Sequence, residues 1–449
     1  MSRTSLIVIA CLLLLRPSWG QRRGTPPGEL NFLFFEAVNL ISSDSTKSRI
    51  DIHYRIDQEF FVLTRNTSPS FPWDFKRRGE IAIELLDSLG ESRARDIERA
   101  EMGTNDTEPG DVRHWHQGVA SFNVPPGLYK VVLEIDDLES ERKHINREAT
   151  IRARKFDSDS AYSTPLFIDW TGPGFLPDSL VSENFGGNML FGGKCCLYVE
   201  FPSDQFKDTL VSASYTISTT SARQQKPEVV ISENIPKPVA MKAFALELGR
   251  ENVSATYRIV PSSSERRLGV LIPLASEKLP LRNLDIDLVV RHGKKETGIS
   301  KNFRMVWPEM PLSLRDIDFA LESLRFITTE NQLDSLKRGS LDHRRDNLEA
   351  FWKTRDKTPE TAFNEVMTEY YHRVDYARRN FGTLKEPDGL RSDRGRIYVL
   401  YGPPTRTNRN LSPEAGYQEV WSYESLSKKF VFADQNKSGN YILISTQPL

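Results

Sequence analysis

The run Ile50-Asp51-Ile52-His53-Tyr54-Arg55-Ile56 decides the fold of the N-terminal half of the chain. Apolar and polar residues alternate in it, and successive side chains of a β-strand point to opposite faces of a sheet. Ile50, Ile52, Tyr54 and Ile56 would therefore share one buried face. Similar runs lie at residues 79–86, 112–124, 128–135 and 149–153, with turn signals between them. Short strands separated by turns predict an antiparallel β-sandwich of immunoglobulin-like form.

A second series of strand-like runs follows the small and polar segment 156–163, which has the composition of a linker. Its candidate strands are residues 197–201, 210–219, 240–248, 254–260, 267–272 and 284–291. Residues 172–193 are rich in glycine and proline and predict an exposed loop. We therefore expect two tandem β-sandwich domains, residues 21–155 and 156–308.

After the second sandwich the apolar period changes from two to 3.6, which predicts helices. Ser313 could cap a helix that carries Ile317, Leu321, Leu324 and Ile327 on one side. A second helix is predicted over residues 341–355.

A third helix is predicted to begin at Thr358-Pro359-Glu360, because proline fits the first helical position. Its apolar stripe consists of Phe363, Met367, Tyr370, Val374, Ala377 and Phe381. Four strand-like runs follow at residues 395–401, 418–423, 429–433 and 440–444. A turn at 436–439 would pair the last two. The predicted C-terminal domain, residues 309–449, is therefore α+β.

The first twenty residues have the pattern of a signal peptide. Arg3 precedes an apolar stretch over residues 6–15, and Ser18-Trp19-Gly20 forms a small-x-small cleavage site. The apolar stretch is too short to cross a bilayer as a helix, which takes about 20 residues. We expect cleavage after Gly20, a secreted or periplasmic location and no transmembrane segment.

The composition excludes several classes of site. Sixty basic residues balance 61 acidic ones, so the total charge does not favour nucleic acid. Seven histidines and three cysteines are too few for a dense metal site or a disulfide framework, and no cofactor is expected. His114-Trp115-His116 supplies only two imidazoles, which we interpret as surface or edge-strand side chains. Of the adjacent Cys195 and Cys196, we expect one to be buried and one to lie at a surface or interface.

Two runs in the C-terminal third carry a family resemblance. One is residues 351–359, Phe-Trp-Lys-Thr-Arg-Asp-Lys-Thr-Pro, and the other is Gly389-Leu390-Arg391-Ser392-Asp393, followed by Arg-Gly-Arg-Ile-Tyr and a Tyr-Gly-Pro-Pro turn. Over about residues 312–449 the chain resembles the GWxTD-domain family. Leu390 stands where the signature Trp is usual, and Lys357 where Pro is usual, whereas Ser392 keeps the hydroxyl of Thr.

The replacement of the signature Trp has two interpretations. Either that position has a packing role that Leu can fill, or this member has lost a binding function. The family has no assigned activity, so the resemblance implies a fold and an exported location rather than a reaction.

Polar residues of the C-terminal domain are the candidate ligand-binding residues. They are Arg355, Asp356, Asn364, Glu365, Glu369, Arg373, Asp393, Arg394 and Arg396. Glu365, Glu369 and Arg373 lie four apart on one helix face. Arginine pairs with carboxylates in two-point geometry, so the main interpretation is a network that holds the helices on the sheet. The alternative is a pocket for a carboxylate-bearing or peptide ligand.

A general acid–base pair of Glu365 and Asp393 is a third interpretation. A catalytic acid needs a raised pKa, and neighbouring arginines lower the pKa of a carboxyl group, so we assign no catalytic residue.

The sequence favours a non-enzymatic interaction or scaffold protein of the cell envelope, whose partner is another envelope protein or a peptide. The alternative is a periplasmic or secreted hydrolase that acts on a peptide or glycan at the C-terminal helix–sheet junction. A deep cleft that holds Glu365 and Asp393 without arginine partners would favour the hydrolase. A shallow apolar or edge-strand surface on the sheet would favour binding.

Overall fold

The structure is a computed structural model. It describes residues 32–105, 114–157, 161–169, 178–202, 211–219, 227–249, 255–263, 267–293, 295–383, 387–410 and 417–449. The predicted signal peptide lies outside these residues, so cleavage after Gly20 and the secreted or periplasmic location stay predictions. No helix in the described ranges is long and apolar enough to span a membrane.

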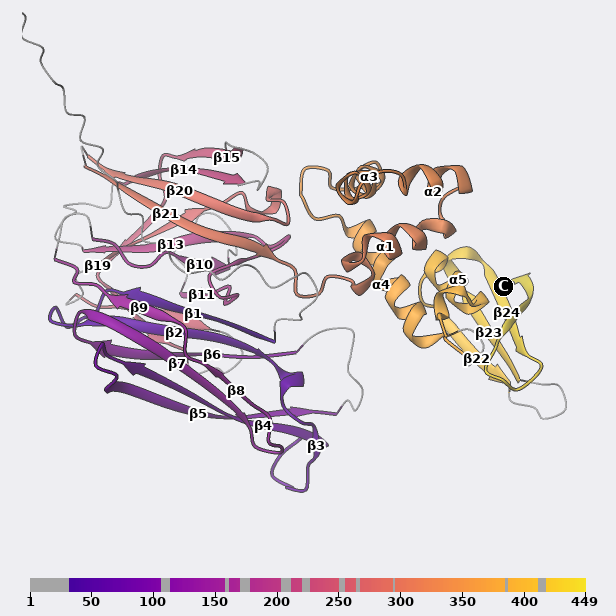
Figure 1. The fold of residues 1–449 in the computed structure, drawn as a ribbon, viewed down its shortest axis with the longest axis horizontal. Helices are drawn as coiled ribbons and strands as arrows, with labels where there is room; N and C mark the ends of the chain where they lie inside the picture. Colours follow the sequence, from indigo (N-terminus) through magenta and orange to yellow (C-terminus); the bar gives the residue numbers. More distant parts are fainter. Residues whose placement is uncertain are drawn as a thin grey trace, which may run out of the picture. The chain divides into compact units, whose positions relative to one another are not determined.

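In the first β-rich region the described residues form two antiparallel sheets with an apolar core between them (Figure 1). One sheet has the order β1 (Leu33–Leu40), β2 (Ser48–Asp57) and β6 (Trp115–Val124). The other has the order β3 (Thr64–Arg65), β4 (Phe75–Leu86), β7 (Gly127–Asp137) and β8 (Lys143–Asn146), with β5 (Ser92–Thr104) beside β4 and β9 (Thr150–Ala153) beside β7. Ile50, Ile52, Tyr54 and Ile56 of β2 all lie in the core, as their alternation predicts.

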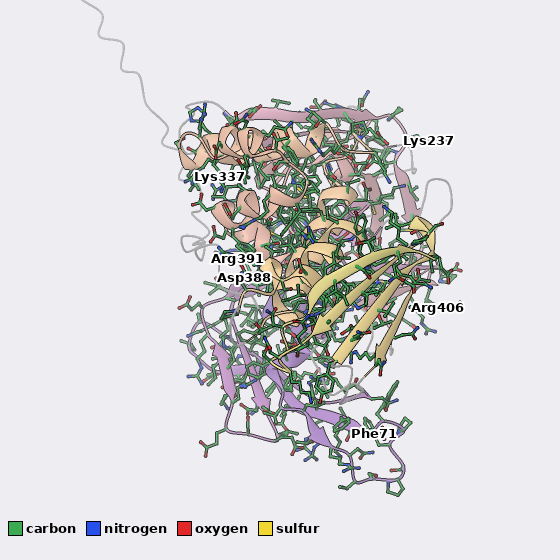
Figure 2. The ribbon with its side chains drawn as sticks, turned by 90° about the vertical axis from the view of Figure 1, so that its right-hand side faces the viewer. Phe71, Lys237, Lys337, Asp388, Arg391 and Arg406 are labelled. Carbon is green, nitrogen blue, oxygen red and sulfur yellow. The ribbon has the colours of Figure 1, made fainter. Side chains whose placement is uncertain are left out.

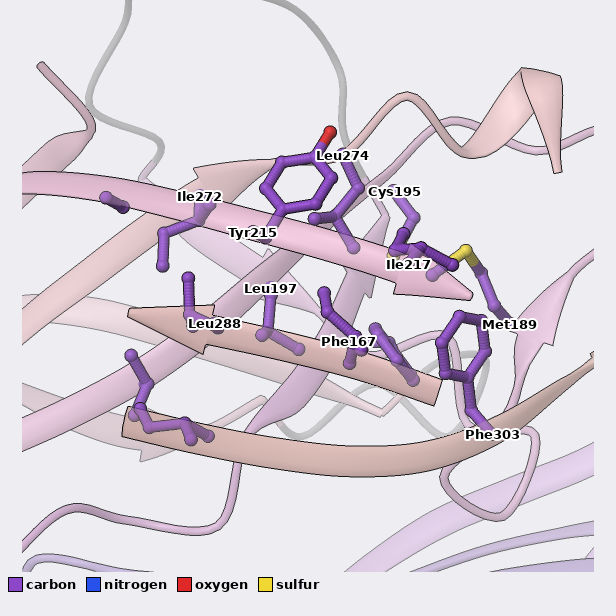
Figure 3. Packing of buried hydrophobic residues seen from close by; sticks show 14 of the residues in the cluster. Phe167, Met189, Cys195, Leu197, Tyr215, Ile217, Ile272, Leu274, Leu288 and Phe303 are labelled. Carbon is purple, nitrogen blue, oxygen red and sulfur yellow. The ribbon is translucent and has the colours of Figure 1, made fainter. Parts of the chain in front are cut away.

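In the second β-rich region the described residues form three sheets. They are β10 (Leu166–Asp169), β13 (Cys195–Pro202), β19 (Arg267–Pro273) and β16 (Val239–Lys242); β12 (Met189–Leu190), β21 (Lys295–Val306), β20 (Asn283–His292), β14 (Ser212–Thr219) and β15 (Glu228–Ile235); and β11 (Ser179–Val181), β18 (Thr256–Pro261) and β17 (Phe244–Leu248). Figure 3 shows the core between the first two sheets, where Leu197 of β13 lies near Tyr215 of β14 and Leu288 of β20.

The C-terminal region is α+β. Its described helices are η4 (Leu312–Arg315), α1 (Ile317–Ser323), η5 (Leu324–Phe326), α2 (Glu330–Leu336), α3 (Leu341–Lys353), α4 (Glu365–Asn380), η6 (Gly389–Arg391), α5 (Asp393–Tyr401) and η7 (Glu424–Leu426). Its antiparallel sheet has the order β22 (Arg406–Asn410), β23 (Tyr417–Tyr423), β24 (Lys428–Asp434) and β25 (Ile442–Pro448). The predicted fold class, mainly β with a C-terminal α+β region, is confirmed. The immunoglobulin-like form and the domain boundaries near residues 155 and 308 stay predictions.

Two predicted helix starts are wrong. Asp316, not Ser313, caps α1, because its side chain accepts the N–H groups of Asp318 and Phe319. Helix α4 begins at Glu365 after its cap Asn364, and not at Thr358. The residues before this cap form turns, and there Phe363 leaves the predicted stripe and packs against Phe191 and Trp307.

The predicted strand over residues 395–401 is a helix, α5. Its aromatic and β-branched residues favour a strand by propensity. The side chain of Ser392 accepts the N–H of Gly395, however, and so caps a helix at this place. Ile397 and Val399 are buried in the C-terminal core, which stabilises the helix against its local preference.

Two expectations about exposure are also wrong, those for the predicted loop and for the two cysteines. The described part of the predicted loop contains the buried residues Glu183, Asn184 and Phe185. His116 lies on β6, an edge strand of its sheet as expected, and its side chain is buried and bonded to Glu98, 2.9 Å from Nε2 to Oε1.

Cys195 and Cys196 are both buried free thiols. Strand β13 has an apolar layer on each face, so its two neighbouring side chains enter two different cores.

Candidate functional site

The motif that gives the resemblance, Gly389 to Asp393, forms the turn between α4 and α5. The backbone of Gly389 lies directly against the end of α4. A Cβ atom at Gly389 would lie 2.3 Å from the carbonyl oxygen of Ala377 and 2.6 Å from the amide nitrogen of Gly382. Both neighbours are backbone atoms, so this close approach requires glycine.

Leu390, at the position of the family's signature Trp, is a core residue. Its side chain is 1% exposed and belongs to the cluster that includes Trp352, Phe381 and Trp421. The structure therefore gives this position a packing role, which a large apolar residue fills.

Ser392 uses its hydroxyl for two backbone hydrogen bonds. The hydroxyl donates to the carbonyl oxygen of Gly389 at 2.7 Å and accepts the N–H of Gly395 at 3.0 Å. It thus joins the η6 turn to the first turn of α5. Threonine carries the same hydroxyl, so a threonine at this position could form the same two hydrogen bonds.

Asp393 connects helix α5 to the edge strand β25. One carboxylate oxygen accepts the N–H of Leu443 at 2.9 Å, and the other lies 3.3 Å from the guanidinium of Arg396. A carboxylate in the first turn of a helix also interacts favourably with the helix dipole.

Arg394 lies in a half-buried aromatic site beside the sheet. Its guanidinium is 4.3 Å from the ring centre of Tyr441 and 5.2 Å from that of Phe381. It forms an ion pair of 3.3 Å with Glu419, which also accepts the indole N–H of Trp421 at 2.7 Å. Burial lowers the pKa of Arg394, and the carboxylate of Glu419 opposes this shift.

The sequence did not identify Glu419 as the partner of Arg394. The burial of Glu419 could nevertheless be predicted from the sequence. Glu419, Trp421 and Tyr423 are alternate residues of β23, so their side chains lie on the same face of the strand. An acidic residue on the buried face of a strand predicts a cationic or N–H partner.

Four candidates lie at the junction of α3 and α4. Asn364 caps α4 by accepting the N–H of Met367 at 2.8 Å, and its amide donates to the carbonyl of Trp352 at 3.0 Å. Glu365 accepts the hydroxyl of Thr358 at 2.7 Å.

Asp356 and Arg355 complete this junction. Asp356 accepts the N–H of Thr358 at 2.9 Å. The guanidinium of Arg355 lies 3.7 Å from the ring centre of Phe351.

Glu369 and Arg373 form an ion pair of 2.7 Å on α4. The guanidinium of Arg373 packs against Gly402, where φ is +78° and a Cβ atom would lie 3.1 Å from the guanidinium carbon. Nearby, the rings of Tyr376 and Tyr398 stack with their centres 4.4 Å apart. Burial, together with Tyr376 and Glu369, raises the pKa of Tyr398 to about 12.

The nine candidates therefore form three separate groups rather than one pocket. The groups are Arg355, Asp356, Asn364 and Glu365; Glu369 and Arg373; and Asp393, Arg394 and Arg396. Among the described residues, no hydrogen bond or ion pair joins Glu365 to Asp393. The part of the chain that the structure describes contains no group of three or more His, Cys, Asp or Glu placed to hold a metal ion.

The C-terminal region also matches the model of a known protein family. The model of the GWxTD domain matches residues 294–447, which include the Gly389–Asp393 turn and the sheet beside it. The chain is a GWxTD domain-containing protein. The match begins earlier than the expected residue 312, so the GWxTD domain as the family defines it also includes β21.

Other comparisons add little to the GWxTD assignment. No curated protein sequence matches the chain. One solved structure, titled as manganese lipoxygenase of Gaeumannomyces graminis with part of zonadhesin of Komagataella pastoris, aligns with 60% of this chain and 93% of its own. The identity is 12% and the TM-score is 0.14, so this likeness carries no argument.

Proposed function

We propose that this GWxTD domain-containing protein is an exported, non-enzymatic interaction or scaffold protein of the cell envelope. In this proposal the C-terminal α+β region binds an envelope protein or peptide, and the two β-rich regions support it. The N-terminal sequence supports the exported location, through its signal-peptide pattern.

The observation that carries the proposal is how the motif residues are used. The hydroxyl of Ser392 and the carboxylate of Asp393 bind backbone N–H groups of α5 and β25. The hydrolase alternative required a cleft that holds both Glu365 and Asp393 without arginine partners, and Asp393 is paired with Arg396. The motif therefore supports a role in assembling a module rather than in a reaction.

The sheet supplies a surface that suits binding. Among the described residues, strand β22 pairs only with β23, and all five residues of β22 are exposed (Figure 2 labels Arg406). At the opposite edge, Asp393 already accepts an N–H of β25. Edge strands bind extended peptides by adding a strand. Arg406 and Arg409, whose side chains are 75% and 66% exposed, would favour an acidic partner over self-association.

A capture experiment tests this proposal. The mature protein, a version that ends near residue 310, and a full-length R406E/R409E variant are each used to recover partners from envelope extract. R258E is the matched control, because Arg258 is equally exposed on another strand and is likewise paired with a glutamate. We expect the truncated and double variants to lose partners that the wild type and R258E retain. Recovery of the same partners by all four proteins would refute the C-terminal region as the binding module.

A further inference from the structure

The polar face of β2 is buried. The alternation of Arg49, Asp51 and His53 with isoleucines predicts a solvent-facing side, yet Asp51 and His53 are 0% exposed. The residues that cover them come from strands β17 and β18 of the second β-rich region, about 200 positions further along the chain. A buried polar contact of this kind is stable only when its polar and charged groups are hydrogen-bonded or ion-paired, because an unpaired buried group costs free energy.

The contact is a chain of four side chains. Arg49 forms a two-point ion pair with Asp51, with both nitrogen–oxygen distances at 2.9 Å, and donates to the carbonyl oxygen of Leu246 at 2.6 Å. The hydroxyl of Tyr257 donates to Asp51 at 2.8 Å and lies 2.6 Å from Nε2 of His53.

The direction of each hydrogen bond follows from the charge of Asp51. Burial alone would raise the pKa of Asp51, but the ion pair with Arg49 and the hydrogen bonds from Arg49 and Ser121 hold it below its usual range. An ionised carboxylate only accepts, so the single hydroxyl proton of Tyr257 points to Asp51. His53 must then donate from Nε2 to Tyr257, which leaves Nδ1 without a proton.

Nδ1 of His53 is buried and has no hydrogen-bond partner among the described residues. The charged or titratable groups that face the ring are Asp51 and Arg49 on β2, Glu36 on β1, Tyr257 on β18 and Lys301 on β21. Asp51 is paired with Arg49, and Glu36 is paired with Lys301 at 2.8 Å. No unpaired carboxylate in this set is available to stabilise an imidazolium.

We propose that His53 makes the contact between the two β-rich regions sensitive to acid. Protonation of Nδ1 places a charged N–H group in a buried site where the described residues offer it no acceptor. The protonated ring therefore favours states in which β2 and β18 separate and His53 meets water. This device is independent of the proposed binding function of the C-terminal region.

The sign of the effect follows from burial. Desolvation lowers the pKa of His53 below the ordinary value of 6.5, so the separated or unfolded state binds the proton more readily. Stability is fully present above about pH 6.5 and is lost as the pH falls from there toward the folded-state pKa. For one proton, the equilibrium constant for separation rises by up to about tenfold per pH unit in this window.

Titration of Glu183 changes the pH dependence of stability in the direction opposite to that of His53. Burial raises its pKa to about 7, so its contribution to stability increases as the pH falls from about 7 to about 4.5. The pH curve of the wild type alone therefore cannot isolate His53. A comparison of variants can.

The test uses the full chain and the variant H53Q. The glutamine amide can still donate to Tyr257 but does not titrate. Urea unfolding between pH 7.5 and 5.0 is measured for both proteins, with hydrogen exchange of β2 and β18 amides as a local readout. H114Q, which alters an exposed histidine just before β6, is the control. Below pH 6.5 we expect the equilibrium constant for opening to rise more steeply in wild type and H114Q than in H53Q. The difference in slope is up to about tenfold per pH unit.

Parallel pH curves for wild type and H53Q would overturn the proposal. If H53Q fails to fold, an NMR titration of the wild-type histidines decides the question. Titration of the His53 ring at or above pH 6.5 would also refute it, whereas titration of this ring below that value, at the onset of β2–β18 exchange, supports it; His116 is assigned separately because it is buried and bonded to Glu98.

Discussion

Replacement of Gly389 by alanine tests the packing of the family motif most directly. The new Cβ atom would lie 2.3 Å from the carbonyl oxygen of Ala377, about 1 Å inside an ordinary non-bonded contact. Because both close neighbours are backbone atoms, the η6 turn must move, and with it Leu390 and the Ser392 cap. Overpacking typically costs about 1–3 kcal/mol, and rigid neighbours place G389A near or above the upper value. A loss of about 3 kcal/mol corresponds to a drop in Tm of roughly 6–12 °C.

Gly298 supplies the matched control. It lies in β21, its φ is not positive, and a Cβ atom there would meet nothing within 4 Å. G298A should therefore leave stability unchanged or raise it by about 0.4–1 kcal/mol. The assay is differential scanning calorimetry of the full chain, with limited proteolysis to identify the transition that contains residues 387–449. If G389A and G298A melt within 2 °C of each other, the close approach inferred at Gly389 is wrong.

Three further predictions concern the C-terminal region and the β-rich regions. L390A should lower the free energy of unfolding by about 2–5 kcal/mol, because it empties a core position, and urea unfolding that shows less than about 1 kcal/mol would remove its packing role. D393N should speed hydrogen exchange of the Leu443 amide and cost about 0.5–1 kcal/mol through the helix dipole and the Arg396 pair; unchanged exchange would contradict this. E183Q should stabilise the chain by roughly 3 kcal/mol at pH 8 and by little at pH 4.5, because Glu183 must ionise in a buried site above about pH 7; a pH-independent effect in urea unfolding would argue against that burial.

The C-terminal region shows where prediction from sequence succeeded and where it did not. The stripe of Tyr370, Val374 and Ala377 is buried as its spacing predicts, because helical periodicity is a local property of the sequence. The residues of α5 have the composition of a strand and form a helix, because Ser392 caps them and the core accepts Ile397. Contacts made by residues distant in sequence override local propensity there.

The candidate site shows the same division. Residue type alone indicated that arginines and carboxylates of the C-terminal domain would pair, and Glu369–Arg373 does so at a spacing of four. The division of the nine candidates into three groups depends on where α3, α4, α5 and β25 lie. That arrangement is set by core packing and is not encoded in the spacing of the polar residues.

For β2, the sequence by itself determined which side chains enter the first core, because alternation assigns Ile50, Ile52 and Ile56 to one face of any sheet. The fate of the opposite face was decided only by the tertiary structure. On a solvent-exposed face Asp51 and His53 would be ordinary surface residues. In the structure β17 and β18 cover this face and bury both side chains. The physical reason is that alternation fixes a direction, whereas burial of a polar face also requires a second surface that completes its hydrogen bonds.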